Sequence, residues 1–225
     1  MRSWQALPLV TTAACLAVLL LPLTNEAFAS SVEVSVVDRD ATPVAGVAVY
    51  WRLPDGKRQV ASSGATAVMD QVDTRFVPHV LIVQTGTSVQ FPNSDTVAHH
   101  VYSFSHPNQF KLPIYKGDAH PPVTFHESGV VILGCNIHDN MLGYILVVDT
   151  PAFGITDENG KVQLKTGDSA GELVIWSPRI RDGEEALVKA LVPTGNAAQQ
   201  VDFRLGKALR PPFDKSTEAL AWTDY

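Results

Sequence analysis

Short runs of β-forming residues, broken repeatedly by Gly and Pro, constrain the fold of this chain more than any other feature. Valines occupy every second position of the run 31–37, which is the spacing of one face of a strand. Nine further runs have β character: 46–51, 77–84, 88–91, 98–104, 130–133, 143–148, 172–176, 185–192 and 200–205. No segment keeps a helical period, so the sequence predicts an all-β fold of sandwich type.

The charge pattern excludes two classes of partner. Lys plus Arg number 17 against 23 Asp plus Glu, which gives a net charge of -6, and the basic residues form no cluster. Nucleic acids and anionic membrane surfaces are bound through concentrated positive charge. We therefore expect neither as a partner.

The first 29 residues have the pattern of a secretory signal peptide. Arg2 precedes a mostly apolar stretch over 6–23, and Ala27-Phe28-Ala29 is a small-x-small cleavage signature. The alternative is a retained membrane anchor, but threonines and prolines leave the apolar run shorter than the roughly 20 residues that a span needs. We expect cleavage of 1–29, export to the periplasm and no membrane attachment afterwards.

Export changes the meaning of the two cysteines. Cys15 would leave with the signal peptide, so the mature chain would carry Cys135 alone and form no internal disulfide. An unpaired thiol in an oxidising compartment is open to oxidation. Cys135 is therefore expected to be deeply buried or bound to a metal ion.

The residues around this cysteine favour the second interpretation. Cys135, His138 and Met141 follow one another at spacings of three within a short connection between two expected strands. A thiolate, an imidazole and a thioether, joined by a second imidazole from elsewhere, are the ligands of a blue-copper site. Methionine is a poor zinc ligand and a good one for Cu(I), so the set favours copper over zinc.

An upstream segment contains Phe91-Pro92-Asn93 and, after a short interval, His99-His100-Val101. This pattern resembles the cupredoxins, especially plastocyanin and amicyanin. The resemblance implies a Greek-key cupredoxin β-sandwich over 61–149 that holds one type 1 copper ion. The ligands it implies are His99, Cys135, His138 and Met141.

The choice between two adjacent histidines depends on strand geometry. Neighbouring side chains on a strand point to opposite faces, so His99 and His100 cannot both readily enter one small site. The family pattern selects His99 and has Asn where this chain has His100, which stays open as the alternative ligand. For His106 and His120 we expect ordinary surface or structural roles, with a secondary copper site as the alternative.

A second resemblance concerns the segments on either side of 61–149. The stretch 37–49 resembles the opening strands of carboxypeptidase-regulatory-like and transthyretin-like sandwiches, and its usual Thr-Asp-x-x-Gly partner begins only at Thr156. We therefore expect 30–58 and 150–205 to form a flanking β-sandwich. The cupredoxin would be inserted in it or packed beside it, with a loose tail over 206–225.

Together these patterns predict an exported electron carrier and not an enzyme. The resemblance implies a transient redox partner, such as a periplasmic dehydrogenase or cytochrome, and similar proteins are sometimes associated with methylamine utilisation. The partner would dock on an apolar rim around His138, for which the candidates are Ile137, Leu142, Leu112 and Pro113. The alternatives are a copper protein for delivery, storage or sensing, and a structural β-sandwich module.

Overall fold

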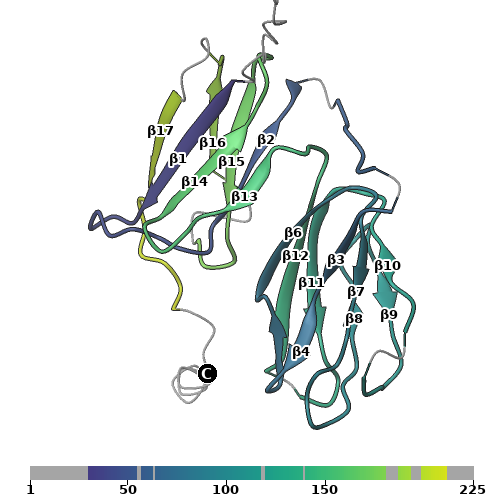
Figure 1. Cartoon of the computed structure of the whole chain (residues 1–225). Coiled ribbons are helices and arrows are strands. Elements are labelled where there is room, and N and C mark those ends of the chain that lie inside the picture. The colour runs from purple at the N-terminus through teal and green to yellow at the C-terminus, as the bar shows by residue number, and fades with distance from the viewer. Residues whose placement is uncertain are drawn as a thin grey trace, which may run out of the picture.

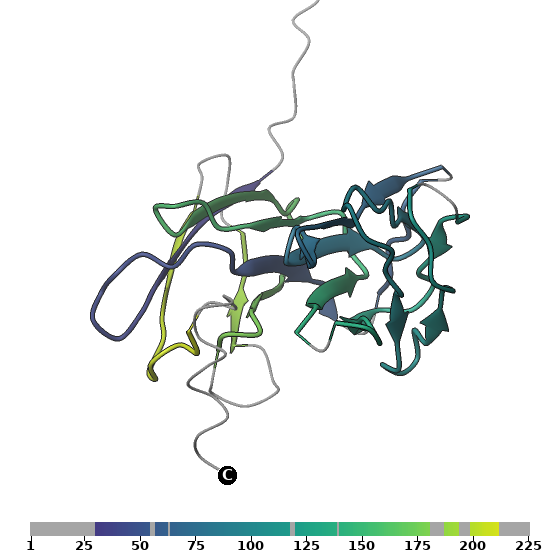
Figure 2. The ribbon, with the colours of Figure 1, turned by 90° about the horizontal axis from the view of Figure 1, so that it is seen from below.

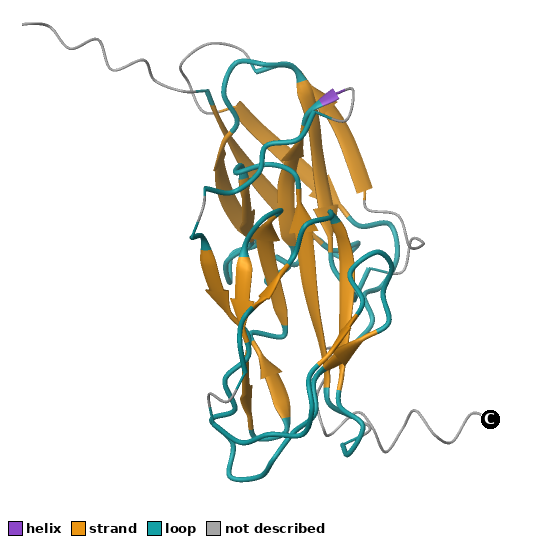
Figure 3. Ribbon diagram, turned by 90° about the vertical axis from the view of Figure 1, so that its right-hand side faces the viewer, coloured by secondary structure: helices purple, strands orange, loops and turns teal. Residues whose placement is uncertain are grey.

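The computed structural model describes residues 30–54, 57–62, 64–117, 120–138, 140–180, 187–193 and 199–211. The expected signal peptide, 1–29, and most of the expected tail, 212–225, lie outside these ranges. The named elements in them are all β-strands, and Figure 3 shows strands throughout apart from one short helical turn, so the all-β prediction is confirmed. None of the described segments forms a helix with the length and hydropathy that a bilayer crossing requires.

Two sheets made from both ends of the chain form one sandwich. One sheet has the order β14-β1-β17, and its strands are Lys161–Lys165, Ser31–Val37 and Gln199–Arg204. The other has the order β13-β2-β15-β16, and its strands are Phe153–Ile155, Ala48–Arg52, Gly171–Trp176 and Leu187–Leu191. The alternating valines of β1 are fully buried in the core between the sheets, where they pack with Trp51 and Phe203.

The middle of the chain forms a second sandwich. One sheet has the order β10-β7-β3, with strands Val123–Thr124, Ser88–Gln90 and Thr66–Val68. The other has the order β6-β12-β11-β8-β9, with strands Val80–Gln84, Leu142–Val148, Gly129–Gly134, Tyr102–Ser103 and Phe110–Lys111. A hairpin of β4 (Asp70–Val72) and β5 (Arg75–Val77) is added at one end. This middle sandwich has a separate core, which includes Phe76, Val89, Phe125, Leu133 and Ile145.

The two sandwiches lie side by side, with segments from both ends of the chain in one of them (Figures 1 and 2). The outer face of β12 contributes Leu146 and Val148 to an apolar cluster with Ala48 of β2. Trp176 of β15 also packs there, and its ring meets Tyr144 of β12 edge-on with centroids 5.7 Å apart. This third cluster joins the two cores, so the flanking sandwich covers part of the outer face of the five-stranded sheet.

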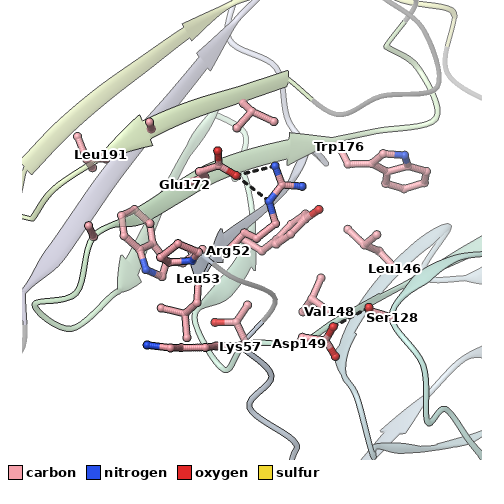
Figure 4. Close-up of a pocket in the computed structure, with 18 of the residues that line it drawn as sticks. Arg52, Leu53, Lys57, Ser128, Leu146, Val148, Asp149, Glu172, Trp176 and Leu191 are labelled. Atoms are coloured by element: carbon pink, nitrogen blue, oxygen red, sulfur yellow. Dashed lines mark hydrogen bonds and ion pairs between the residues drawn. The ribbon is translucent and has the colours of Figure 1, made fainter.

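A cleft of about 1210 Å³ opens beside this junction (Figure 4). Its walls come from both sandwiches and include Leu146 and Trp176. Arg52 and Glu172 form an exposed ion pair on one wall, with Nη2 and Oε2 2.6 Å apart. None of the four residues predicted to bind copper lines the cleft, so the candidate metal centre is a separate feature.

Two of the expected strands are shorter than the sequence suggested. The run 77–84 enters the five-stranded sheet only at Val80, because Pro78 has no N–H to donate to a ladder. In the run 98–104 only Tyr102 and Ser103 belong to a strand. The preceding part leaves the sheet, since His99 pairs instead with Tyr115 in an isolated bridge.

Candidate metal centre

Three of the predicted residues meet at one end of the middle sandwich. Cys135 directly follows β11, and His138 lies three residues on, in the connection to β12. His99 comes from the segment before β8, where the N–H and C=O groups of His99 and Tyr115 bond to each other. His99 and Cys135 are buried and His138 is half-buried. Residues 36 positions apart are thus held together by two separate β connections.

The distances among the donor atoms fit a three-coordinate metal ion. Nδ1 of His99 and Nδ1 of His138 are 3.1 Å apart, and Cys135 Sγ lies 3.9 Å and 3.8 Å from them. In the plane of these atoms, a point about 2.0 Å from both nitrogens lies about 2.3 Å from the sulfur. Those lengths are typical of metal bonds to imidazole and thiolate. Two imidazoles and one thiolate are also the planar donor set that copper takes in blue-copper sites.

A carboxylate on the far side of His99 fixes the orientation of its ring. Asp95 Oδ2 lies 2.8 Å from His99 Nε2, and the backbone N–H of Thr74 donates to the same oxygen over 2.7 Å. These two hydrogen bonds lower the pKa of Asp95 well below its ordinary value, and the bond from Thr74 has the larger effect. Since an ionised carboxylate only accepts hydrogen bonds, Nε2 carries the proton, and the lone pair of Nδ1 faces Cys135.

Sequence reasoning missed this positioning role of Asp95. The turn between β4 and β5 presents the Thr74 N–H, with Asp73 and Thr74 both at positive φ, 49° and 59°. Asn93 holds the other side of the loop, since its Nδ2 donates to the carbonyls of Val97 and Tyr115, each over 2.9 Å. The available signal was Asn93-Ser94-Asp95, a pattern typical of a tight polar turn.

Met141, the fourth predicted ligand, is buried immediately before β12, with 2% of its surface exposed. Its backbone N–H donates to the carbonyl of His138 over 2.9 Å, which closes the loop that carries His138. Met141 belongs to the same core cluster as Cys135. Its location is compatible with an axial ligand, and the assignment stays a prediction.

His100 lies outside the three-residue cluster. It is 3% exposed, its ring packs against Tyr102 with centroids 5.5 Å apart, and its Nδ1 has no hydrogen-bond partner among the described residues. His120 packs edge-on against Tyr115 at 4.6 Å. In the described part of the chain, His99, Cys135 and His138 are the one group of three or more His, Cys, Asp or Glu donors close enough to share an ion. His106 and His120 therefore take part in no second group of this kind there.

The four residues predicted to form the apolar rim are all accessible in part. Ile137 is 48% exposed, Pro113 is exposed, and Leu112 and Leu142 are half-buried. Ile114, which was not among the predicted rim residues, is 58% exposed and precedes the tyrosine that pairs with His99.

Comparisons with known proteins give partial likenesses. No protein-family model and no curated protein matches the chain. Among solved structures, a purple cupredoxin from Nitrosopumilus maritimus is 22% identical with a TM-score of 0.32, over 37% of this chain and 99% of that one. A reduced amicyanin variant is 23% identical with a TM-score of 0.35, over 44% and 98%.

A copper-containing nitrite reductase from Thermus scotoductus is 23% identical with a TM-score of 0.36, over 51% of this chain and 28% of that one. All three are proteins to which the chain is similar at low identity and in part of its length. Whether the cluster suits a metal ion is decided by the geometry of His99, Cys135 and His138 themselves.

Proposed function

We propose that this protein is a type 1 copper protein that carries single electrons between redox partners. The observation that supports it is the triangle of His99 Nδ1, His138 Nδ1 and Cys135 Sγ, whose sides of 3.1, 3.8 and 3.9 Å suit one ion bound to all three. Met141 is proposed as the weak axial ligand. When bound, copper would supply a one-electron exchange between its cuprous and cupric states.

The residues around the site would make that exchange fast because they keep the metal ligands in fixed positions. Reorganisation of ligands adds to the barrier of every electron transfer, so a carrier needs ligands whose positions are fixed beforehand. Asp95 holds the ring of His99, the Tyr115 bridge holds its backbone, and β11 ends immediately before Cys135. Burial of His99 and Cys135 keeps water from the donor atoms.

His138 is proposed as the point of contact with the partner. It is the only member of the three-residue cluster that is not fully buried. Ile137, the residue before it, is exposed, and so is Ile114, the residue before the Tyr115 that pairs with His99. A small apolar contact suits transient electron-transfer encounters, which need rapid release. We infer that the partner is another exported redox protein, such as a dehydrogenase or a cytochrome, and that the chain acts in the periplasm after removal of 1–29.

A copper titration tests the proposal. We expect one equivalent of Cu(II) to give an intense visible thiolate-to-copper band that Cys135→Ser abolishes. Substitution His99→Ala should weaken or remove the band, whereas His100→Ala, which changes the adjacent buried histidine, should keep it. Tight Cu(I) binding without the Cu(II) band would favour copper delivery or storage. Failure to bind either ion would leave only a structural role.

A further inference from the structure

An exposed aromatic and aliphatic patch lies on the outer face of β8 and β11. Phe104 is 73% exposed and Ile132 is 48% exposed. The rings of Phe104 and Tyr102 pack with centroids 4.9 Å apart. The N–H of Ile132 donates to the hydroxyl of Ser105, the residue after Phe104, so the two exposed side chains belong to adjacent segments. We call Tyr102, Phe104, Ile132 and Lys111 the β8–β11 patch.

The patch continues a surface that already serves as an interface. Further along the same outer face, Leu146 and Val148 of β12 are covered by the flanking sandwich. Tyr144 stands at the margin of that contact, because it packs on Trp176 and lies opposite Ile132 in the β11–β12 register. The flanking sandwich therefore covers one part of an apolar sheet face, and the β8–β11 patch is a part that it leaves open. Exposed apolar side chains that continue a face already used as an interface indicate a further interaction site.

Tyr102 connects the patch to both buried ligands. Its ring lies directly over Gly134, where an added Cβ would be 2.7 Å from Cζ, and Gly134 is bonded to Cys135. Its ring also packs on His100, which is bonded to His99. The Tyr102 ring thus contacts Gly134, the neighbour of Cys135 in the chain, and His100, the neighbour of His99. An electron could pass between Phe104 and the cluster through bonded or touching atoms.

The charge of the patch indicates the kind of partner. Lys111 lies opposite Tyr102 in the β8–β9 register, on the same face, and forms no ion pair with the described residues. An unpaired ammonium beside exposed rings suits an apolar surface bordered by carboxylates.

We propose that the β8–β11 patch is a second docking surface, used by a redox protein whose contact face is apolar and bordered by carboxylates. The inference rests on the proposed electron-carrier function. Each transfer would move one electron between the partner's centre and the copper, so that one is oxidised as the other is reduced. No bond or proton changes place, and Tyr102 and Phe104 serve only as a bridge. A carrier with two contact faces can receive at one and donate at the other.

Binding is tested first, without copper. Bis(dipicolinato)chromate(III) is an aromatic, carboxylate-bearing, paramagnetic monoanion that does not exchange electrons here. Added to the metal-free chain, it should broaden the NMR signals of Phe104 and Ile132. The Lys111→Glu variant should lose that broadening, and Val188→Ala, an exposed apolar control on β16, should keep it. Broadening confined to Ile137 and Ile114, or absent, would overturn the proposal.

Electron transfer is tested second, with the cobalt(III) analogue as oxidant of the copper(I)-loaded chain. This step converts Cu(I) to Cu(II) and Co(III) to Co(II). Phe104→Ala and Lys111→Glu should each slow it several-fold with the visible spectrum unchanged, and Val188→Ala should not. Equal rates in all variants would contradict the second surface. Failure of the carrier function would be visible separately, as a chain that forms no blue species although the chromium complex still binds.

Discussion

The Asp95 carboxylate offers the sharpest test of how the chain holds its metal centre. In Asp95→Ala, the Nε2–H of the fully buried His99 and the N–H of Thr74 both lose their acceptor. A buried donor left without a partner costs about 1–3 kcal/mol. Because the Thr74 N–H is only partly buried, we expect the loss of both bonds to lower the unfolding free energy by about 2–4 kcal/mol. Freed of its partner, the His99 ring can rotate, and loss of such a ligand-orienting contact weakens metal affinity by about 10- to 100-fold.

Two assays measure these effects on the same proteins. Urea unfolding of the metal-free chain gives the stability change, and competition with a Cu(I) chelator gives the affinity change. The control is Asp38→Ala, because Asp38 likewise accepts two hydrogen bonds, from the backbone N–H groups of Asp40 and Thr42, but in an exposed turn directly after β1 of the flanking sandwich. If Asp95→Ala alters Cu(I) affinity no more than Asp38→Ala does, the positioning role of Asp95 is refuted.

Three further predictions concern the stability of the two sandwiches. Gly160→Ala should destabilise the chain more than Gly167→Ala in urea unfolding. Both glycines have positive φ, 70° and 67°, and that conformation costs about 1–2 kcal/mol for any side chain. Only at Gly160 would the new Cβ also collide with backbone atoms. Burial raises the pKa of Asp149, but hydrogen bonds from neighbouring side chains outweigh it and lower the pKa below its ordinary value. Its stabilisation should therefore be present above about pH 4 and disappear as the pH falls further, so the stability gap between wild type and Asp149→Asn should close under acid; a gap independent of pH would contradict this. Leu146→Ala, at the contact between the sandwiches, should cost about 2–5 kcal/mol in calorimetric or urea unfolding, and a loss below 1 kcal/mol would show that this contact contributes little.

The strands that could be predicted from the sequence are those with enough residues to display a period. The seven residues of β1 alternate strictly between buried and half-buried positions, and the sequence alternates with them. Strands such as β9 (Phe110–Lys111) and β10 (Val123–Thr124) have two residues each, so they carry no period of their own. Their existence depends on partners that are distant in the sequence. The flanking sheets likewise join β1 to β17 across most of the chain.

The candidate site divides in the same way. Cys135 and His138 are three residues apart, so their proximity follows from one local motif. His99 required a family pattern and the alternation of strand faces, and it is His99, not His100, that meets the other two. Asp95 acts only because the Thr74 turn, 21 residues away, presents an N–H to it. The contact between Thr74 and Asp95 arises from the tertiary fold, so it cannot be predicted from a local spacing of residues.

Protein-film voltammetry of the copper-loaded chain addresses electron carriage most directly. We predict a single reversible one-electron wave that persists as the scan rate rises, since the ligands are held alike in both oxidation states, and no wave for Cys135→Ser. Copper that stays bound in the wild-type chain yet gives an irreversible response, or none, would contradict the carrier function.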